Sequence, residues 1–267
     1  MRYLLFLLCL MPLVAQAKAN VVTSILPLQQ ITAAIMQGVD EPELLIKSQH
    51  SAHHFAFKPS HFRKLKSADL LIWIDRNFES GFQRIPEILK SSTTSLELLR
   101  ALDLQNQDGH IWYSPKLLTK IVDLIGAALV EIDRPQADIY RNNARSLQLA
   151  IVKWAQHTEH QLASVSPKYV LDHDFLHYFQ RDFGLQALAT IHDSHDQHGG
   201  IQALQAIEQQ VKQNQAKCLL TNESAVSKIG NNLVKKFDLS VHRVQFSGGF
   251  IDHLYRLTES MVKCGQG

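Results

Sequence analysis

The chain has 267 residues, with 27 basic and 25 acidic side chains. Arg2 and Lys18 belong to the leader described next. Without these two basic residues, the basic and acidic side chains are equal in number, so the mature chain is close to neutral. This balance argues against nucleic acid as a partner, because phosphate binding needs a basic surplus. The length allows one large or two modest domains, either of which can bury a substantial core.

Residues 1–19 have the features of a secretory signal peptide. A short positive region precedes an apolar run over residues 4–14, and small residues follow at Ala15, Ala17 and Ala19, in two possible cleavage frames. A membrane span would need about 20 apolar residues. Cys9 lies inside the apolar run and not behind a lipobox, so no lipid anchor is expected. We therefore expect a soluble, exported mature protein.

Residues 20–134 alternate between strand-like and helical patterns, which predicts an N-terminal α/β lobe. The predicted strands are residues 21–26, 43–46, 69–74 and 96–99, and the predicted helices are residues 28–36, 59–67, 78–90 and 115–132. Residues 69–74 are almost continuously apolar, which is typical of a strand buried on both faces of a parallel sheet.

Residues 135–165 are predicted to form a linking helix. The segment 136–164 contains no glycine or proline and carries apolar residues at helical spacing. A helix of this length would be about 40 Å long, enough to run along a two-lobed protein.

Residues 166–267 repeat the first pattern and predict a C-terminal α/β lobe. The predicted strands are residues 168–171, 186–191, 217–221 and 240–245, and the predicted helices are residues 175–183, 201–213, 224–237 and 250–264. The expected fold class is therefore α/β, with two similar (β/α) lobes that have parallel-type sheets and are joined by a long helix.

Three histidines lie where predicted strands end or a helix is about to begin. His53 follows the second strand, His110 precedes the helix at 115–132, and His173 follows the first strand of the second lobe. Ligands of open α/β sheets bind beyond the carboxyl ends of the strands, so the three side chains could meet between the lobes. Because imidazole is the commonest metal-ligating side chain, we predict a metal site at the lobe interface.

The sequence around these histidines also carries a family resemblance. The strings are His53-His54-Phe55 with Lys58-Pro59-Ser60, residues 66–73, His110-Ile111-Trp112-Tyr113-Ser114-Pro115, and His173-Asp174 with Tyr178-Phe179. In this order they closely resemble the ZnuA-like periplasmic zinc-binding proteins of ABC importers, in the metal-binding solute-binding family. The resemblance covers the whole mature chain. It implies two α/β lobes, a long linking helix, and a metal held between the lobes by His53, His110 and His173.

The resemblance further implies a periplasmic carrier without enzymatic activity. Such a protein captures Zn(II) and delivers it to an ABC permease in the inner membrane for high-affinity zinc uptake, and a periplasmic zinc chaperone could be a further partner. A set of three imidazoles suits zinc, whereas manganese-binding relatives place carboxylates among the ligands. Three alternatives stay open. One is a manganese-binding importer component, and another is an exported adhesin or metal-buffering protein with no permease. The third is an exported zinc-dependent hydrolase or hydratase, because three histidines and a water also form a catalytic zinc site. No HExxH motif supports the hydrolase.

The sequence departs from the family where a fourth ligand is often found. Ala52 stands where some members have an acid before the first histidine, and residues 246–250 lack the aspartate that others place before the last helix. The fourth ligand could be water or a neighbour such as His54. A separate cluster, His192, His195 and His198, is either an auxiliary zinc site or a solvated loop.

Cys218 and Cys264 are the two cysteines outside the leader. An even pair in an exported protein favours one disulfide, with two buried thiols as the alternative. The family resemblance implies the same bond, between the third strand of the C-terminal lobe and the last helix.

Overall fold

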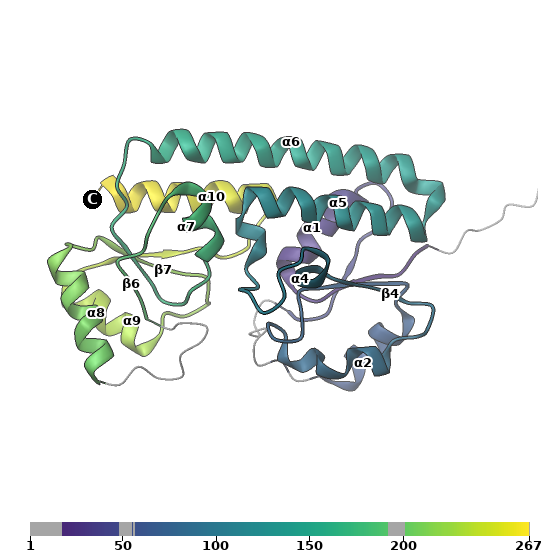
Figure 1. Ribbon diagram of the computed structural model, residues 1–267, viewed down its shortest axis with the longest axis horizontal. Helices are drawn as coiled ribbons and strands as arrows, with labels where there is room; N and C mark the ends of the chain where they lie inside the picture. Colours follow the sequence, from purple (N-terminus) through teal and green to yellow (C-terminus); the bar gives the residue numbers. More distant parts are fainter. Residues whose placement is uncertain (1–17, 48–54, 56, 192–200, 267) are drawn as a thin grey trace, which may run out of the picture.

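Two lobes lie side by side in the computed structural model, which describes residues 18–47, 55, 57–191 and 201–266 (Figure 1). Each lobe contains a four-stranded sheet, with strand orders β2-β1-β3-β4 and β6-β5-β7-β8. All the strand pairs are parallel. The predicted fold class, two α/β lobes with parallel sheets and a long helix, is confirmed.

The first lobe places its helices around strands that are too short to be stable alone. Its elements are β1 (Val21–Thr23), α1 (Leu26–Met36), β2 (Glu43–Leu44), α2 (Pro59–Ser67), β3 (Leu70–Trp73), the 3-10 helix η2 (Ser80–Arg84), α3 (Ile85–Ile88), β4 (Thr94–Glu97), α4 (Leu98–Ala101), the 3-10 helix η3 (Ile111–Tyr113) and α5 (Pro115–Ile132). Every residue of β3 is buried, as expected for a central strand covered on both faces.

The second lobe follows a short 3-10 helix, η4 (Arg134–Gln136), and the long helix α6 (Ala137–Leu162). Its elements are β5 (Tyr169–Leu171), α7 (His177–Phe183), β6 (Ala189–Thr190), α8 (Ile201–Gln213), β7 (Cys218–Thr221), α9 (Lys228–Phe237), β8 (Ser240–Arg243) and α10 (Phe250–Gln266). The predicted disulfide is present between Cys218 and Cys264, whose Cα atoms are 5.6 Å apart.

Helix α6 runs along one side of both lobes, with α10 beneath one half and α1 and α5 beneath the other (Figure 1). Trp154 anchors it: the buried indole Nε1 donates to the carbonyl of Leu254, at 3.0 Å, and lies 3.1 Å from Thr258 Oγ1. The main apolar core extends through both lobes. The domain boundaries predicted from the sequence stay a prediction. None of the helices in the described part of the chain combines the length and hydropathy needed to cross a membrane.

Several observed strands are shorter than predicted, for example β6, and three further differences have a local cause. Residues 78–90 form η2 and α3 instead of one helix, because Pro86 has no backbone N–H to continue the helical hydrogen bonds. The strand predicted at 96–99 is β4, which ends at Glu97, and α4 follows from Leu98. The helix predicted from residue 224 begins at Lys228, because the Ser227 side chain caps it by accepting from the N–H of Gly230.

Glu79 is a buried acid in the turn after β3. Its Oε2 accepts a hydrogen bond from the backbone N–H of Ile74, at 2.9 Å. Burial is the main cause that raises the pKa of Glu79 to about 8, so the folded protein holds this carboxyl protonated at neutral pH. Its neighbour Phe78 reaches the candidate site described below.

Replacing Glu79 with glutamine should remove a pH-dependent loss of stability. Above pH 4.5 the unfolded chain releases the Glu79 proton, whereas the folded protein keeps it until about pH 8. Stability therefore falls as the pH rises through this window, by about 3 kcal/mol at pH 7. Urea unfolding at several pH values measures this effect. The free energy of unfolding of Glu79→Gln, relative to that of the parent, should increase as the pH rises. A constant difference between the two would contradict the assignment.

Candidate metal site

His110 lies at the entry to η3, in the N-terminal lobe, and its side chain is buried. The Phe78 ring packs against it in a T-shaped arrangement at a centroid distance of 5.0 Å, and the centroid of the Trp112 ring lies 5.3 Å away. Gly109 is required beside it, since a Cβ atom at this position would collide with the Phe78 ring. The His110 imidazole is therefore held by contacts with the rings of Phe78 and Trp112, and the backbone at Gly109 lies close against the Phe78 ring.

Asp108 sets the orientation of the His110 ring. Both its carboxylate oxygens lie 3.2 Å from His110 Nδ1, and Oδ1 also accepts from the His110 backbone N–H at 2.8 Å. Burial opposes ionisation of Asp108, but attraction to His110 and hydrogen bonds from it outweigh burial and lower the pKa of this carboxyl. Because the carboxylate accepts the Nδ1 proton, Nε2 is the nitrogen that presents a lone pair.

His173 follows β5 by two residues, in the C-terminal lobe, and is half-buried. The residue before it, Asp172, is buried and accepts from the Ser227 backbone N–H at 2.8 Å and from the Ser227 hydroxyl at 2.5 Å. The Asp172 backbone N–H donates to the carbonyl of Leu220 on β7. The loop that carries His173 is thus fixed to the sheet on one side and to the start of α9 on the other.

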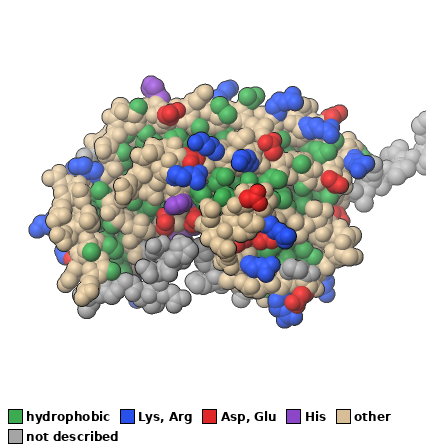
Figure 2. Space-filling model, in the orientation of Figure 1, with side chains coloured by type: hydrophobic (Ala, Val, Ile, Leu, Met, Phe, Trp, Pro, Cys, Tyr) green, Lys and Arg blue, Asp and Glu red, His purple; other side chains and the backbone are tan. Residues whose placement is uncertain are grey.

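The structure brings His110 and His173 together across the boundary between the lobes. Their ring centroids are 5.2 Å apart, with the ring planes at 69°. Tyr178 of the C-terminal lobe donates to the backbone carbonyl of Asp108, at 2.9 Å, which ties the two sides together. In Figure 2, histidine and acidic side-chain atoms reach the surface between the two halves of the molecule.

A second buried histidine, His253 on α10, links the lobes without serving as a ligand. Its Nδ1 donates to the carbonyl of Gln245, at 3.1 Å, so its Nε2 accepts from the hydroxyl of Tyr113, at 3.2 Å. Burial is the main cause that lowers the pKa of His253 to about 4. Phe246 stacks on this ring at 3.6 Å. Both ring nitrogens are therefore engaged, and the loop before α10 is held in place.

Several sequence-predicted candidates lie outside the described residues: His53, His54, His192, His195 and His198. His61, near His53 in the sequence, is described, and its Nδ1 accepts from the backbone N–H of Lys58 at the start of α2. That contact gives His61 a role in capping the helix. Trp73 and Trp112 are buried, as core residues are.

Comparison with known proteins places the chain in a family. The family model ZnuA, described as zinc-uptake complex component A, periplasmic, matches residues 21–263. The chain belongs to the ZnuA family. A zinc uptake protein ZnuA of Haemophilus ducreyi is 26% identical, over 84% of each chain. A crystal structure of ZnuA has a TM-score of 0.84 at 17% identity, over 94% of this chain and all of the other. The structure of a manganese-bound periplasmic metal-binding protein of Candidatus Liberibacter asiaticus has a TM-score of 0.75 at 17% sequence identity. The match covers 91% of this chain and 100% of the other.

Asp108 and Asp172 are the residues of this ZnuA-family site that sequence reasoning missed. Asp108 lies between the strand predicted at 96–99 and His110. An aspartate two positions before a histidine can reach its Nδ1, and that spacing was the available signal. Asp172 carried no local signal, because its partner Ser227 lies 55 residues away.

Replacing Asp108 with asparagine should weaken metal binding at His110 about tenfold, because the carboxylate that orients His110 and raises its basicity is lost while the shape is kept. Competition titration of zinc against a chromophoric chelator measures the change. Asp138→Asn is the matched control, since Asp138 is exposed at the start of α6. Equal affinities of Asp108→Asn and the control would rule out this positioning role.

Proposed function

We propose that this protein captures Zn(II) in the periplasm and delivers it to an ABC permease in the inner membrane. The observation that carries the proposal is the meeting of His110, from the first lobe, with His173, from the second, at a centroid distance of 5.2 Å. A metal bound there would be held by both lobes. The release of such a metal can therefore be coupled to a movement of one lobe against the other.

We assign His53, in the segment that follows β2 in the sequence, as the third ligand. Support comes from the described residues before the loop. The backbone N–H groups of Leu45 and Ile46 donate to the carbonyls of Thr23 and Ser24, which carries the chain to the carboxyl edge of the first sheet. Ligands in open α/β folds bind at this edge. Water or His54 completes the coordination in this proposal.

Zinc is proposed over manganese because the assigned ligands are imidazoles. Neutral imidazole nitrogens suit zinc, whereas manganese favours harder carboxylate and carbonyl oxygens. Asp108 does not count as a ligand in this assignment, since its two oxygens face His110 Nδ1. The ion is the cargo of a carrier here and not a catalytic cofactor.

The test is binding and delivery by the purified mature protein. Calorimetry should give one tight zinc per chain and weaker manganese binding, and zinc-loaded protein should support zinc uptake into vesicles that contain the cognate permease. A preference for manganese would favour the alternative importer, and zinc-dependent ester hydrolysis lost on His173→Ala would favour a hydrolase. Either result would overturn the proposal.

A further inference from the structure

The disulfide of the C-terminal lobe has a histidine beside it. Cys218 begins β7 and Cys264 lies near the end of α10, and both are buried. His242 lies on β8, which pairs with β7 so that His242 is opposite Leu220. Leu220 and Cys218 are two residues apart on one strand, so His242 and Cys218 share the face of the sheet that α10 covers.

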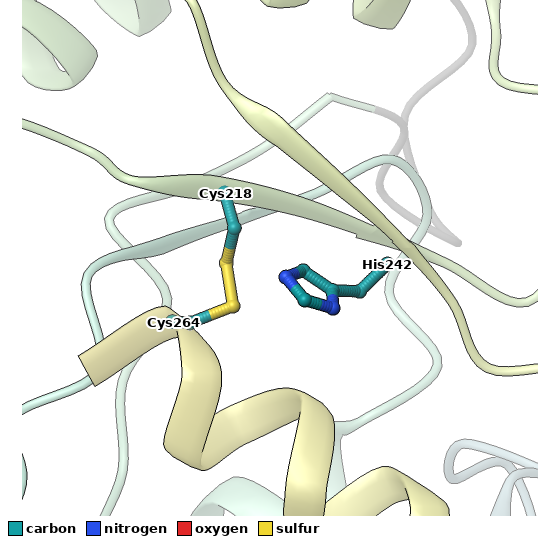
Figure 3. A group of neighbouring side chains, drawn as sticks. All are labelled: Cys218, His242 and Cys264. Carbon is teal, nitrogen blue, oxygen red and sulfur yellow. A yellow bond between two sulfur atoms is a disulfide. The ribbon is translucent and has the colours of Figure 1, made fainter. Parts of the chain in front are cut away.

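The three side chains point at one another. The two sulfur atoms and a ring nitrogen of His242 all lie within 4.8 Å of one another, and Figure 3 shows one nitrogen of the ring directed toward the disulfide. In the described part of the chain, this is the one group of at least three histidine, cysteine or acidic side chains with metal-binding geometry. Cys218 lies at the amino end of β7, whereas His173 lies beyond the carboxyl end of the parallel strand β5. The group is therefore separate from the candidate site at His110 and His173.

We propose that the reduced form of this disulfide, together with His242, is a second zinc site. A tetrahedral zinc ion with Zn–S bonds of about 2.3 Å places two thiolates about 3.8 Å apart. The two sulfurs can separate to that distance by side-chain rotation, because the Cα atoms of Cys218 and Cys264 are 5.6 Å apart. His242 supplies the third ligand, and since its side chain is only half-buried, water can take the fourth position.

The chemistry balances with a thiol as reductant. Two thiol molecules, R–SH, reduce the Cys218–Cys264 bond to two cysteine thiols and leave as R–S–S–R. Zinc then displaces one proton from each cysteine thiol and binds the two thiolates. The charges of the ion and the two thiolates cancel, so the group is neutral despite its burial.

The surroundings favour a neutral imidazole and two thiolates. Burial, followed by the positive charge of Lys263, lowers the pKa of His242, which keeps its ring neutral and able to bind a metal. His242 Nε2 lies 3.3 Å from Ser240 Oγ, a contact that it can give up because Ser240 Oγ donates to the carbonyl of Lys217. A nearby ammonium group also stabilises thiolates. The zinc ion would tie β7 to α10 in place of the disulfide.

The experiment separates this site from the proposed transport site. The mature chain carrying His53→Ala, His110→Ala and His173→Ala is reduced without oxygen and titrated with cobalt(II), then with zinc. One cobalt per chain should bind with a thiolate-to-cobalt charge-transfer absorption that zinc abolishes, and the oxidised protein should give no such absorption. The absence of the absorption in the reduced protein would overturn the proposal. This result does not depend on whether the proposed transport site binds zinc, because its three histidines are replaced.

Single substitutions in the same background test the histidine. His242→Ala should lower the affinity of the reduced protein at least about 100-fold, whereas His160→Ala, an exposed histidine of α6, should leave it unchanged. Circular dichroism follows folding throughout. If reduction loosens the C-terminal lobe, zinc should restore it in the protein with His242. Failure to restore it, or equal affinities of the two variants, would overturn the proposal.

Discussion

His173→Ala should lower the zinc affinity of this protein by about three orders of magnitude, or about 4 kcal/mol. Structural zinc sites gain about 10 to 16 kcal/mol from three or four ligands, so each ligand contributes several kcal/mol. His173 is the assigned ligand that comes from the C-terminal lobe. Its loss should therefore also remove the bridge between the lobes that the proposed zinc site would form.

The measurement is isothermal calorimetry with a competing chelator at neutral pH. His110→Ala should cause a loss of similar size, because its ring faces that of His173 at 5.2 Å. His160→Ala should bind zinc like the parent, since its exposed side chain lies on α6. Asp172 and Ser227 hold the backbone before His173, so His173→Ala should keep the fold. Unchanged affinity in His173→Ala would remove this residue from the site.

Elements with a strong local signal were predicted well from the sequence. Helix α5 begins at Pro115 and ends at Ile132, as predicted, because Ser114 caps it and Pro115 suits the first turn. Helix α6 begins two residues later and ends three residues earlier than the predicted linking helix. The all-buried strand β3 follows from its apolar run.

One of the elements predicted wrongly, α9, depends on a contact between distant residues. Helix α9 begins late because Asp172, 55 residues away, binds the N–H and hydroxyl of Ser227. The site contains both kinds of contact. Asp108 and His110 are neighbours in the sequence, whereas the hydrogen bond from Tyr178 to the carbonyl of Asp108 needs both lobes in place. Local patterns indicate which residues could be ligands. They do not indicate which side chains orient those ligands.

Reducing the Cys218–Cys264 disulfide should lower the free energy of unfolding by about 4 kcal/mol. The bond closes a segment with a sequence separation of 46, and in the chain-entropy model this restricts the unfolded chain by that amount. For a chain of this size, the melting temperature should fall by about 8 to 16 °C. Helix α10 should loosen first, because the bond joins its last turn to β7.

Two forms of the protein should be compared with the oxidised parent by thermal unfolding. The reduced parent is measured with a chelator present, so that no metal can replace the bond. Cys218→Ala with Cys264→Ala removes both the bond and the thiols, and should melt close to the reduced parent. His110 and His173 lie away from the disulfide, on loops held by Asp108 and Asp172, so zinc binding by the transport site should persist in both forms below their melting temperature. Equal melting temperatures for the oxidised and reduced parent would show that the bond adds no stability.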